Sequence, residues 1–381
     1  MSKVSENDLL LCCARTNAAP HVVARLRELA AKNIDWEYLF LLARRHSVVP
    51  LLYLQLNQHA SDLVPEEQLH KLKQHYFENS ARNTVLTAEL CDLIGAFAHS
   101  GIDAIPYKGP VLSLFAYGNI GLRRFVDLDV IVKKTDVLKA RDILLAEGYT
   151  PSKSLSLTQQ ELLLRTQHNL QFWRDNRRLI IELHWEVAPH LFASSVSAEE
   201  LWQNLITIDL NGTKVNALSA DNLLFSLCVH GSRHLWERLS WICDVAELIS
   251  RHRFDWTTLL ERAATADSER IFLLGIHLAH ELLDAPLPDE VRHHCDSDEQ
   301  LKVLAANVVQ HLFNGTTHVP ATSREIFKYN IRVRKTLIAR ARYLAHILRP
   351  TDSDLSRRAV PSRMSFVYYL MRPFRLLRTK I

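Results

Sequence analysis

Two aspartates in an apolar segment have a spacing that could support chemistry. Asp127 and Asp129 lie two positions apart in the segment 126–132, whose β-branched residues predict a strand. Because side chains alternate between the faces of a strand, both carboxylates project from one face. Two like charges side by side repel, and a divalent cation relieves the repulsion. Mg²⁺ binds one or two carboxylates together with phosphate oxygens, so we expect a metal–phosphate site. The alternative is a pair of ordinary surface acids.

Small and basic residues precede this strand. Lys108 and Gly109 stand between a short apolar segment, read as a strand, and a predicted helix that begins at Pro110. Glycine lets a phosphate approach the backbone, and a helix N-terminus offers N–H groups and a positive dipole. Lys108 adds a positive charge, and Arg123 and Arg124 could clamp further phosphate oxygens. The order of these features indicates a phosphate-binding site.

A third carboxylate fits the same pattern. Glu182 lies in the apolar segment 179–185, which predicts another strand, and a neighbouring strand could bring it beside Asp127 and Asp129. Three carboxylates can hold two metal ions, which stabilise the attacking and leaving oxygens of a phosphoryl transfer. Glu186 is the competing candidate, but it follows the expected end of the strand.

The elements that must position these residues are mostly helices. The chain of 381 residues has only 10 glycines, six of them between positions 95 and 148. Apolar residues recur at helical spacing elsewhere, whereas residues 169–173 and 179–185 predict a hairpin turning at 175–177. We expect an α+β, predominantly helical fold with a small mixed sheet. The predicted regions are a helical region at 1–98, an α/β core at 99–190, a helical domain at 191–320 and a basic helical tail at 321–381.

Together these motifs carry a resemblance to a known family. Lys108-Gly109, the segment 123–129 and the segment 182–185 resemble the nucleotidyltransferase superfamily, which has a DNA polymerase β-like core. The chain is most similar to the bacterial group called uncharacterised nucleotidyltransferases, chiefly over residues 85–250. A downstream string is also similar to the helical part of that group: Asp221, His230, Trp236, Leu239, Trp241 and Asp244.

The resemblance implies an activity and its site. Asp127, Asp129 and Glu182 would hold Mg²⁺ or Mn²⁺, and Gly109 would hold the triphosphate of ATP or another NTP. The enzyme would move a nucleoside monophosphate to an acceptor such as a small molecule, a sugar or a peptide. Pro110 departs from the family pattern, which has a second small residue, often serine, after the glycine. A kinase-type phosphoryl transfer and a catalytically silent nucleotide-binding module are the alternatives.

Three further residues are expected to support the site: His184, His230 and Asp244. His230 and His234 share a helix face and could bind a metal ion, but Gly231 weakens that helix and no glutamate follows His230. We instead expect His230 and Asp244 to form a hydrogen bond that pins two helices beside the sheet.

Charge and cysteine content limit the setting of the protein. Residues 323–381 carry 15 lysines and arginines against three acids. This tail, with a predicted helix at 366–377, could pack on the body, contact an anionic membrane surface or contact nucleic acid. The six cysteines form no CxxC pair, which is typical of reduced thiols. No signal pattern and no run of 18 apolar residues occurs, so we expect a cytoplasmic protein without a transmembrane segment, peripheral to a membrane if the tail binds lipid.

Overall fold

The computed structural model describes residues 3–153, 157–175, 179–187, 198–317 and 320–348, together with Val367. The fold is α+β and predominantly helical, with a small mixed sheet, which confirms the predicted class. No helix within these residues is both long and apolar enough to cross a membrane. The predicted helix at 366–377 and the basic tail beyond residue 348 lie outside the described residues, apart from Val367.

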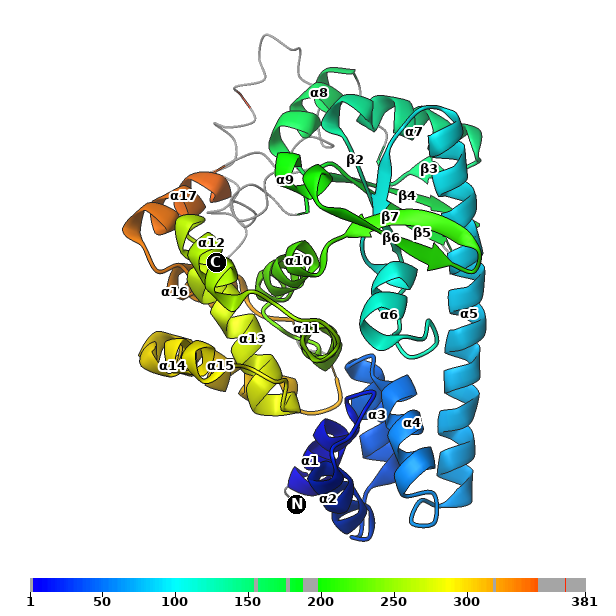
Figure 1. Ribbon diagram of the computed structural model, residues 1–381, viewed down its shortest axis with the longest axis vertical. Coiled ribbons are helices and arrows are strands. Elements are labelled where there is room, and N and C mark those ends of the chain that lie inside the picture. Colours follow the sequence, from blue (N-terminus) through cyan, green and yellow to red (C-terminus); the bar gives the residue numbers. More distant parts are fainter. Residues whose placement is uncertain are drawn as a thin grey trace.

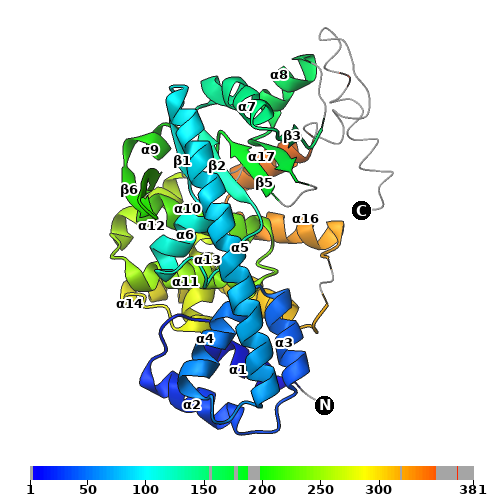
Figure 2. The same ribbon diagram turned by 90° about the vertical axis from the view of Figure 1, so that its right-hand side faces the viewer.

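Four short helices precede one long helix that runs along the molecule. Helix α5 packs beside α4 at one end and reaches the sheet at the other (Figures 1 and 2). Helix α5 is continuous over 34 residues. Asp35 begins α3 by accepting a hydrogen bond from the N–H of Tyr38. The bounds are α1 Val4–Cys13, α2 Pro20–Ala30, α3 Trp36–Arg45, α4 Val49–His59 and α5 Glu66–His99.

The sheet has five strands in the order β1-β2-β5-β4-β3. Strands β2 and β5 are parallel, and every other neighbouring pair is antiparallel. The predicted hairpin is confirmed as β4 and β5, and residues 176–178 of its turn region lie outside the described residues. The bounds are β1 Ala104–Pro106, β2 Leu128–Val132, β3 Thr150–Pro151, β4 Asn169–Arg174 and β5 Leu179–His184.

Short helices connect these strands. Helix α6 follows β1 with Pro110 in its first turn, and Gly118 ends it in the left-handed conformation. After β2 the chain forms a 3₁₀ turn and α7, and α8 leads into β4. The bounds are α6 Gly109–Tyr117, the 3₁₀ turn Lys134–Asp136, α7 Val137–Ala146 and α8 Leu157–Thr166.

The two faces of the sheet differ in chemistry. Leu128 and Val130 of β2 and Leu183 of β5 lie on one face, in a core that also includes residues of α5 and α7. The opposite face carries Asp129 and Glu182, which the parallel register places side by side. Because the side chains alternate along both strands, one register decides which residues meet on each face.

A second hairpin, which the sequence analysis missed, packs beside the sheet. Strands β6 (Leu205–Leu210) and β7 (Thr213–Leu218) follow α9 (Ala198–Gln203) and contribute Leu210 and Val215 to the core of the sheet. Only helices were expected between residue 198 and residue 320. The turn at Asn211 and Gly212, both with positive φ, is a hairpin signal that the sequence does contain.

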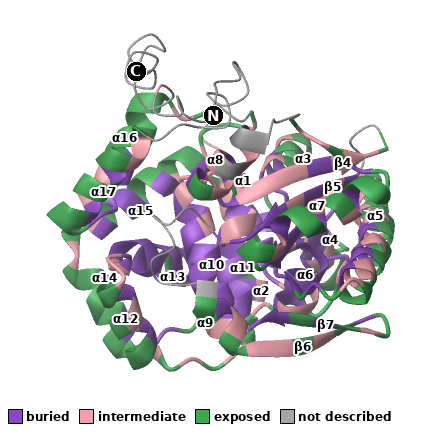
Figure 3. Cartoon of the chain, turned by 90° about the horizontal axis from the view of Figure 1, so that it is seen from above, coloured by how far each residue is buried: buried purple, intermediate pink, exposed green. Residues whose placement is uncertain are grey.

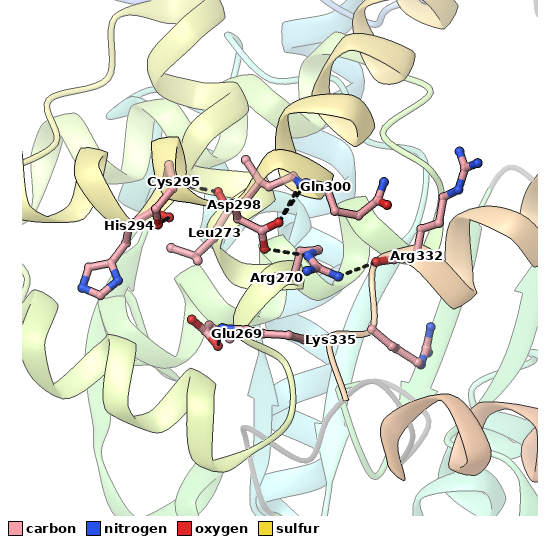
Figure 4. Close-up of polar contacts among 12 residues, drawn as sticks. Glu269, Arg270, Leu273, His294, Cys295, Asp298, Gln300, Arg332 and Lys335 are labelled. Carbon is pink, nitrogen blue, oxygen red and sulfur yellow. Dashed lines mark hydrogen bonds and ion pairs between the residues drawn. The ribbon is translucent and has the colours of Figure 1, made fainter. Parts of the chain in front are cut away.

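The remaining helices form the other side of the molecule. Helices α10 and α11 and the central α13 are largely buried, whereas α12, α14, α16 and α17 have exposed outer faces (Figure 3). Arg270 at the start of α13 donates hydrogen bonds to Asp298, 2.7 Å away, and to the carbonyl of Arg332, also 2.7 Å away (Figure 4). The bounds are α10 Ala220–Arg233, α11 Leu239–Arg251, α12 Trp256–Thr265, α13 Glu269–Leu283, α14 Asp289–Ser297, α15 Glu299–Leu312, α16 Ser323–Arg332 and α17 Leu337–Ile347.

Candidate active site

Helix α5 positions the loop that leads into β2. The amide of Asn83 donates hydrogen bonds to the carbonyls of Ile120, at 2.6 Å, and Arg123, at 2.8 Å. The guanidinium of Arg82 donates to the carbonyl of Phe125 at 3.1 Å. The sequence analysis did not find these supporting residues. Two consecutive polar residues in an otherwise amphipathic helix were the available signal.

Two carboxylates meet on the face of the sheet that lies opposite its apolar core, and two basic groups contact them. Asp129 is 5% exposed, and its Oδ1 lies 3.1 Å from Nζ of Lys108 and 3.1 Å from Nε2 of His184. The same His184 nitrogen lies 3.4 Å from Oε2 of Glu182. Glu182 also accepts a hydrogen bond of 3.1 Å from Asn169. Lys108 and His184 therefore balance the charge of the paired acids.

This arrangement changes the pKa values of the buried groups. Burial by itself would raise the pKa of Asp129, but Lys108 and His184 hold it well below its ordinary value. Burial would lower the pKa of His184, yet hydrogen bonds and the charges of Asp129 and Glu182 raise it. The carboxylate of Asp129 is thus held ionised between cationic partners.

Asp127 lies at the same cavity but in a different setting. It precedes β2, is partly buried, and lies outside the tight cluster of Asp129, Glu182 and His184. Burial raises its pKa to about 6, with further contributions from the charges of Asp129 and Glu182. The two aspartates that share a sequence motif are therefore electrostatically unlike.

A cavity of about 510 Å³ opens over these carboxylates. The sheet, the loop before β2, and helices α10 and α11 supply its walls. Eight of the predicted site residues line it, and Gly109 and Asp244 do not. The eight are Lys108, Arg123, Arg124, Asp127, Asp129, Glu182, His184 and His230.

The expected hydrogen bond between His230 and Asp244 is wrong. Asp244 instead accepts hydrogen bonds from Arg123, at 2.7 and 2.9 Å, and from the hydroxyl of Tyr117 at 2.7 Å. These contacts occupy the buried carboxylate, which is 1% exposed, because a guanidinium matches both of its oxygens. Asp244 still ties a helix to the site, but its partners are the loop before β2 and the end of α6.

His230 lies on the cavity wall among aromatic rings. Its ring stands edge-on to Trp241 at a centroid distance of 5.3 Å and 4.7 Å from the ring of His234. Burial lowers the pKa of His230 well below its ordinary value. Nearby, Arg233 donates a 2.9 Å hydrogen bond to His168, whose pKa burial lowers to about 2. Both histidines are therefore neutral, and Arg233 keeps its positive charge beside the cavity.

Gly109 and Pro110 form the buried first turn of α6. Gly109 has a φ of +54°, which favours glycine, and a Cβ there would lie 3.5 Å from the carbonyl oxygen of Asp127. Pro110 sits where its missing N–H leaves no intrahelical bond unmade. Of these neighbouring residues, only Lys108, which directly precedes the turn, lines the cavity.

The donor atoms of this site fit a divalent cation. Ligand atoms of Asp129, Glu182 and His184 all lie within 4.8 Å of one another. Carboxylate oxygens suit Mg²⁺ and Mn²⁺, and an imidazole nitrogen is also a common ligand of transition metals. A cation bound here would take over the charge compensation that Lys108 and His184 supply.

One known protein family has a model that matches most of this chain. Residues 32–284 match the model of the family described as uncharacterised nucleotidyltransferase, and the chain belongs to this family. The matched region includes the sheet, α5 and the helices that cover the cavity. Neither the curated proteins nor the solved structures gave a match to the chain.

Proposed function

We propose that the protein is a metal-dependent nucleotidyltransferase that moves a nucleoside monophosphate from an NTP to an acceptor. The observation that carries this proposal is the pairing of Asp129 with Glu182 across parallel strands, inside a cavity that also receives Asp127 and Lys108. Membership of a nucleotidyltransferase family supports the reaction class. The acceptor is a small molecule, a sugar or a peptide.

The acidic residues would hold Mg²⁺ or Mn²⁺, which stabilises the attacking and leaving oxygens when bound. Asp129 and Glu182 supply carboxylate oxygens, and Asp127 adds a third at the edge of the cavity. Glu182 helps to activate the acceptor by accepting the proton of an attacking hydroxyl. The bond between the α-phosphorus and its bridging oxygen breaks as the acceptor oxygen bonds to phosphorus, and pyrophosphate leaves.

The basic residues orient the triphosphate. Lys108 stands next to the carboxylates, and Arg124 lies exposed at the cavity rim. Arg123 is held by Asp244, but its Nη1 has no hydrogen-bond partner among the described residues. An arginine held through one edge of its guanidinium can present the other edge to phosphate oxygens at little entropic cost. Gly109 contributes through the turn that carries Lys108.

Calorimetry with ATP, GTP, CTP and UTP in the presence of Mg²⁺ tests the proposal. We expect at least one of them to bind, and we expect the double variant Asp127→Asn with Asp129→Asn to abolish that binding. Binding by none of the four, or binding that the double variant leaves unchanged, contradicts it. Release of pyrophosphate would identify nucleotidyl transfer, whereas release of a nucleoside diphosphate would identify a kinase.

A further inference from the structure

A second cavity, of about 550 Å³, adjoins the carboxylate cavity. The two share Ser47, Arg124 and Arg238 as lining residues, so they are neighbouring compartments of one depression. The second compartment is here called the arginine groove. Its size is in the range of small-molecule sites. Five arginines line it: Arg44, Arg45, Arg82, Arg124 and Arg238.

These arginines come from four separate parts of the chain. Arg44 and Arg45 end α3, and Arg82 lies on α5. Arg124 belongs to the loop before β2, and Arg238 precedes α11. Since no local sequence pattern gathers them, the tertiary fold concentrates the positive charge in one place.

The positive charge of the groove exceeds the negative charge of its described lining residues. None of the five arginines forms an ion pair with a carboxylate among the described residues. Within the part of the chain that the structure describes, Arg45 and Arg82 donate only to backbone carbonyls, and the buried Nε of Arg45 has no acceptor. Arg44 and Arg238 lie over aromatic rings at 5.7 Å. Glu78 is the single carboxylate among the described lining residues.

Crowded guanidinium groups repel one another. Partial desolvation at the cavity rim and the charges of the neighbouring arginines lower the pKa of Arg124 below its ordinary value. A bound anion relieves this repulsion, and phosphate fits best because guanidinium groups bind its oxygens in a two-pronged geometry. Ordinary surface arginines point apart into solvent, whereas these five line one concave site.

We propose that the arginine groove binds the phosphate group of the acceptor, so that the acceptor is a small phosphorylated molecule. This inference rests on the proposed nucleotidyl transfer, because it places the second substrate beside the NTP. The shared wall at Arg124 and Arg238 lets one molecule keep its phosphate in the groove while another of its oxygens reaches the carboxylate cavity. The volume of the groove favours a small molecule over a polymer.

The test measures the binding of inorganic phosphate by calorimetry, without NTP. Arg44 is exposed, lines the groove but not the carboxylate cavity, and forms no ion pair with any residue that the structure describes, so Arg44→Glu should fold normally. We expect this variant to weaken phosphate binding at least tenfold, and Arg238→Ala to weaken it as well. Arg253→Glu makes the same charge change at an exposed site near the far end of α11 and should change binding less than twofold.

The other outcomes separate this inference from the proposed function. We expect Arg44→Glu to change the affinity for Mg²⁺ with an NTP less than twofold. An equal loss of phosphate and NTP binding would mean that the groove holds the triphosphate of the donor, and would overturn the proposal. Phosphate binding that Arg44→Glu leaves intact would also overturn it. If no NTP binds but phosphate binding still depends on Arg44, the proposed function fails and the groove remains an anion site.

A polymer control completes the experiment. A single-stranded DNA of 20 nucleotides is compared with a dinucleotide at the same salt concentration. We expect the two affinities to differ by less than tenfold. Binding of the longer strand at least a hundredfold tighter, with steep salt dependence, would show that the groove belongs to a nucleic-acid track and would overturn the assignment to a small molecule.

Discussion

The guanidinium of Arg123 donates two hydrogen bonds, of 2.7 and 2.9 Å, to the carboxylate of Asp244. The side chains of both residues are almost fully enclosed, at 11% and 1% exposure. Arg123 belongs to the loop that leads into β2, and Asp244 belongs to α11, which lies beside the cavity. This ion pair therefore fixes β2, with Asp129 in it and Asp127 just before it, against the helical part of the molecule.

Breaking this pair should destabilise the protein. Asp244→Asn keeps the shape of the side chain but leaves Arg123 buried without a counter-charge, which costs about 3 kcal/mol in the free energy of unfolding. Urea denaturation measures the loss. Asp103→Asn removes an exposed pair with Lys133 and should cost less than about 1 kcal/mol. Equal effects of the two variants would show that the Arg123 contact is not structural.

Metal binding should depend on the carboxylates of the cluster. Asp129→Asn and Glu182→Gln each remove a charged ligand, so we expect each to weaken Mn²⁺ binding at least about tenfold. Electron paramagnetic resonance of free Mn²⁺ gives the bound fraction directly. Asp142→Asn alters a carboxylate that is 62% exposed in another part of the chain and serves as the control. Unchanged binding in both cluster variants would remove the metal site from the proposal.

Acid should destabilise the protein through His46. This buried ring accepts a hydrogen bond from the N–H of Leu239 and donates one to the carbonyl of Leu312, which ties α3 to α11 and α15. Burial, followed by the charge of Arg45, lowers the pKa of His46 from 6.5 to about 4. The unfolded chain therefore binds this proton at a higher pH than the folded protein does. The contribution of neutral His46 to the free energy of unfolding is present in full above pH 6.5 and is lost as the pH falls toward 4.

The expected loss from His46 is about 3 kcal/mol once the pH is below 4. Unfolding by urea at several pH values between 7 and 4 measures it. Partly buried histidines such as His234 also contribute in acid, so the comparison is made with His46→Gln. The His46→Gln variant should be less stable than the unaltered protein at pH 7 and should lose less stability on acidification. If the free energy of unfolding of the two proteins falls in parallel with pH, His46 is not the group responsible.

Two glycines in helices should respond oppositely to alanine. A Cβ on Gly231 would lie 2.3 Å from the buried ring of Trp236, so Gly231→Ala should cost about 2 kcal/mol by overpacking. A Cβ on Gly95 of α5 meets nothing within 4 Å, and Gly95→Ala should stabilise by about 0.5 kcal/mol through helix propensity. Thermal unfolding compares the variants. Stabilisation by both would mean that the Trp236 ring moves aside freely.

Local patterns predicted most of the elements but not all of their partners. The alternation of apolar residues correctly placed Asp129 and Glu182 in strands and predicted the β4–β5 hairpin, whereas Asp127, expected in the same strand as Asp129, precedes β2. It missed the β6–β7 hairpin, because an alternating segment of six residues is short and lies among helices. It also gave Asp244 the wrong partner, since a buried carboxylate does not reveal which cation will reach it.

The sequence by itself determined the helical frame, the apolar strands and the residue types that stand at the site, because periodicity and propensity act over a few neighbouring positions. Only the tertiary structure decided the parallel register that sets Asp129 beside Glu182, and the insertion of His184 between them. It also gathered the arginines of the groove from α3, α5, a loop and the start of α11. Such contacts join residues far apart in the chain, and they form only when the helices and the sheet pack against each other.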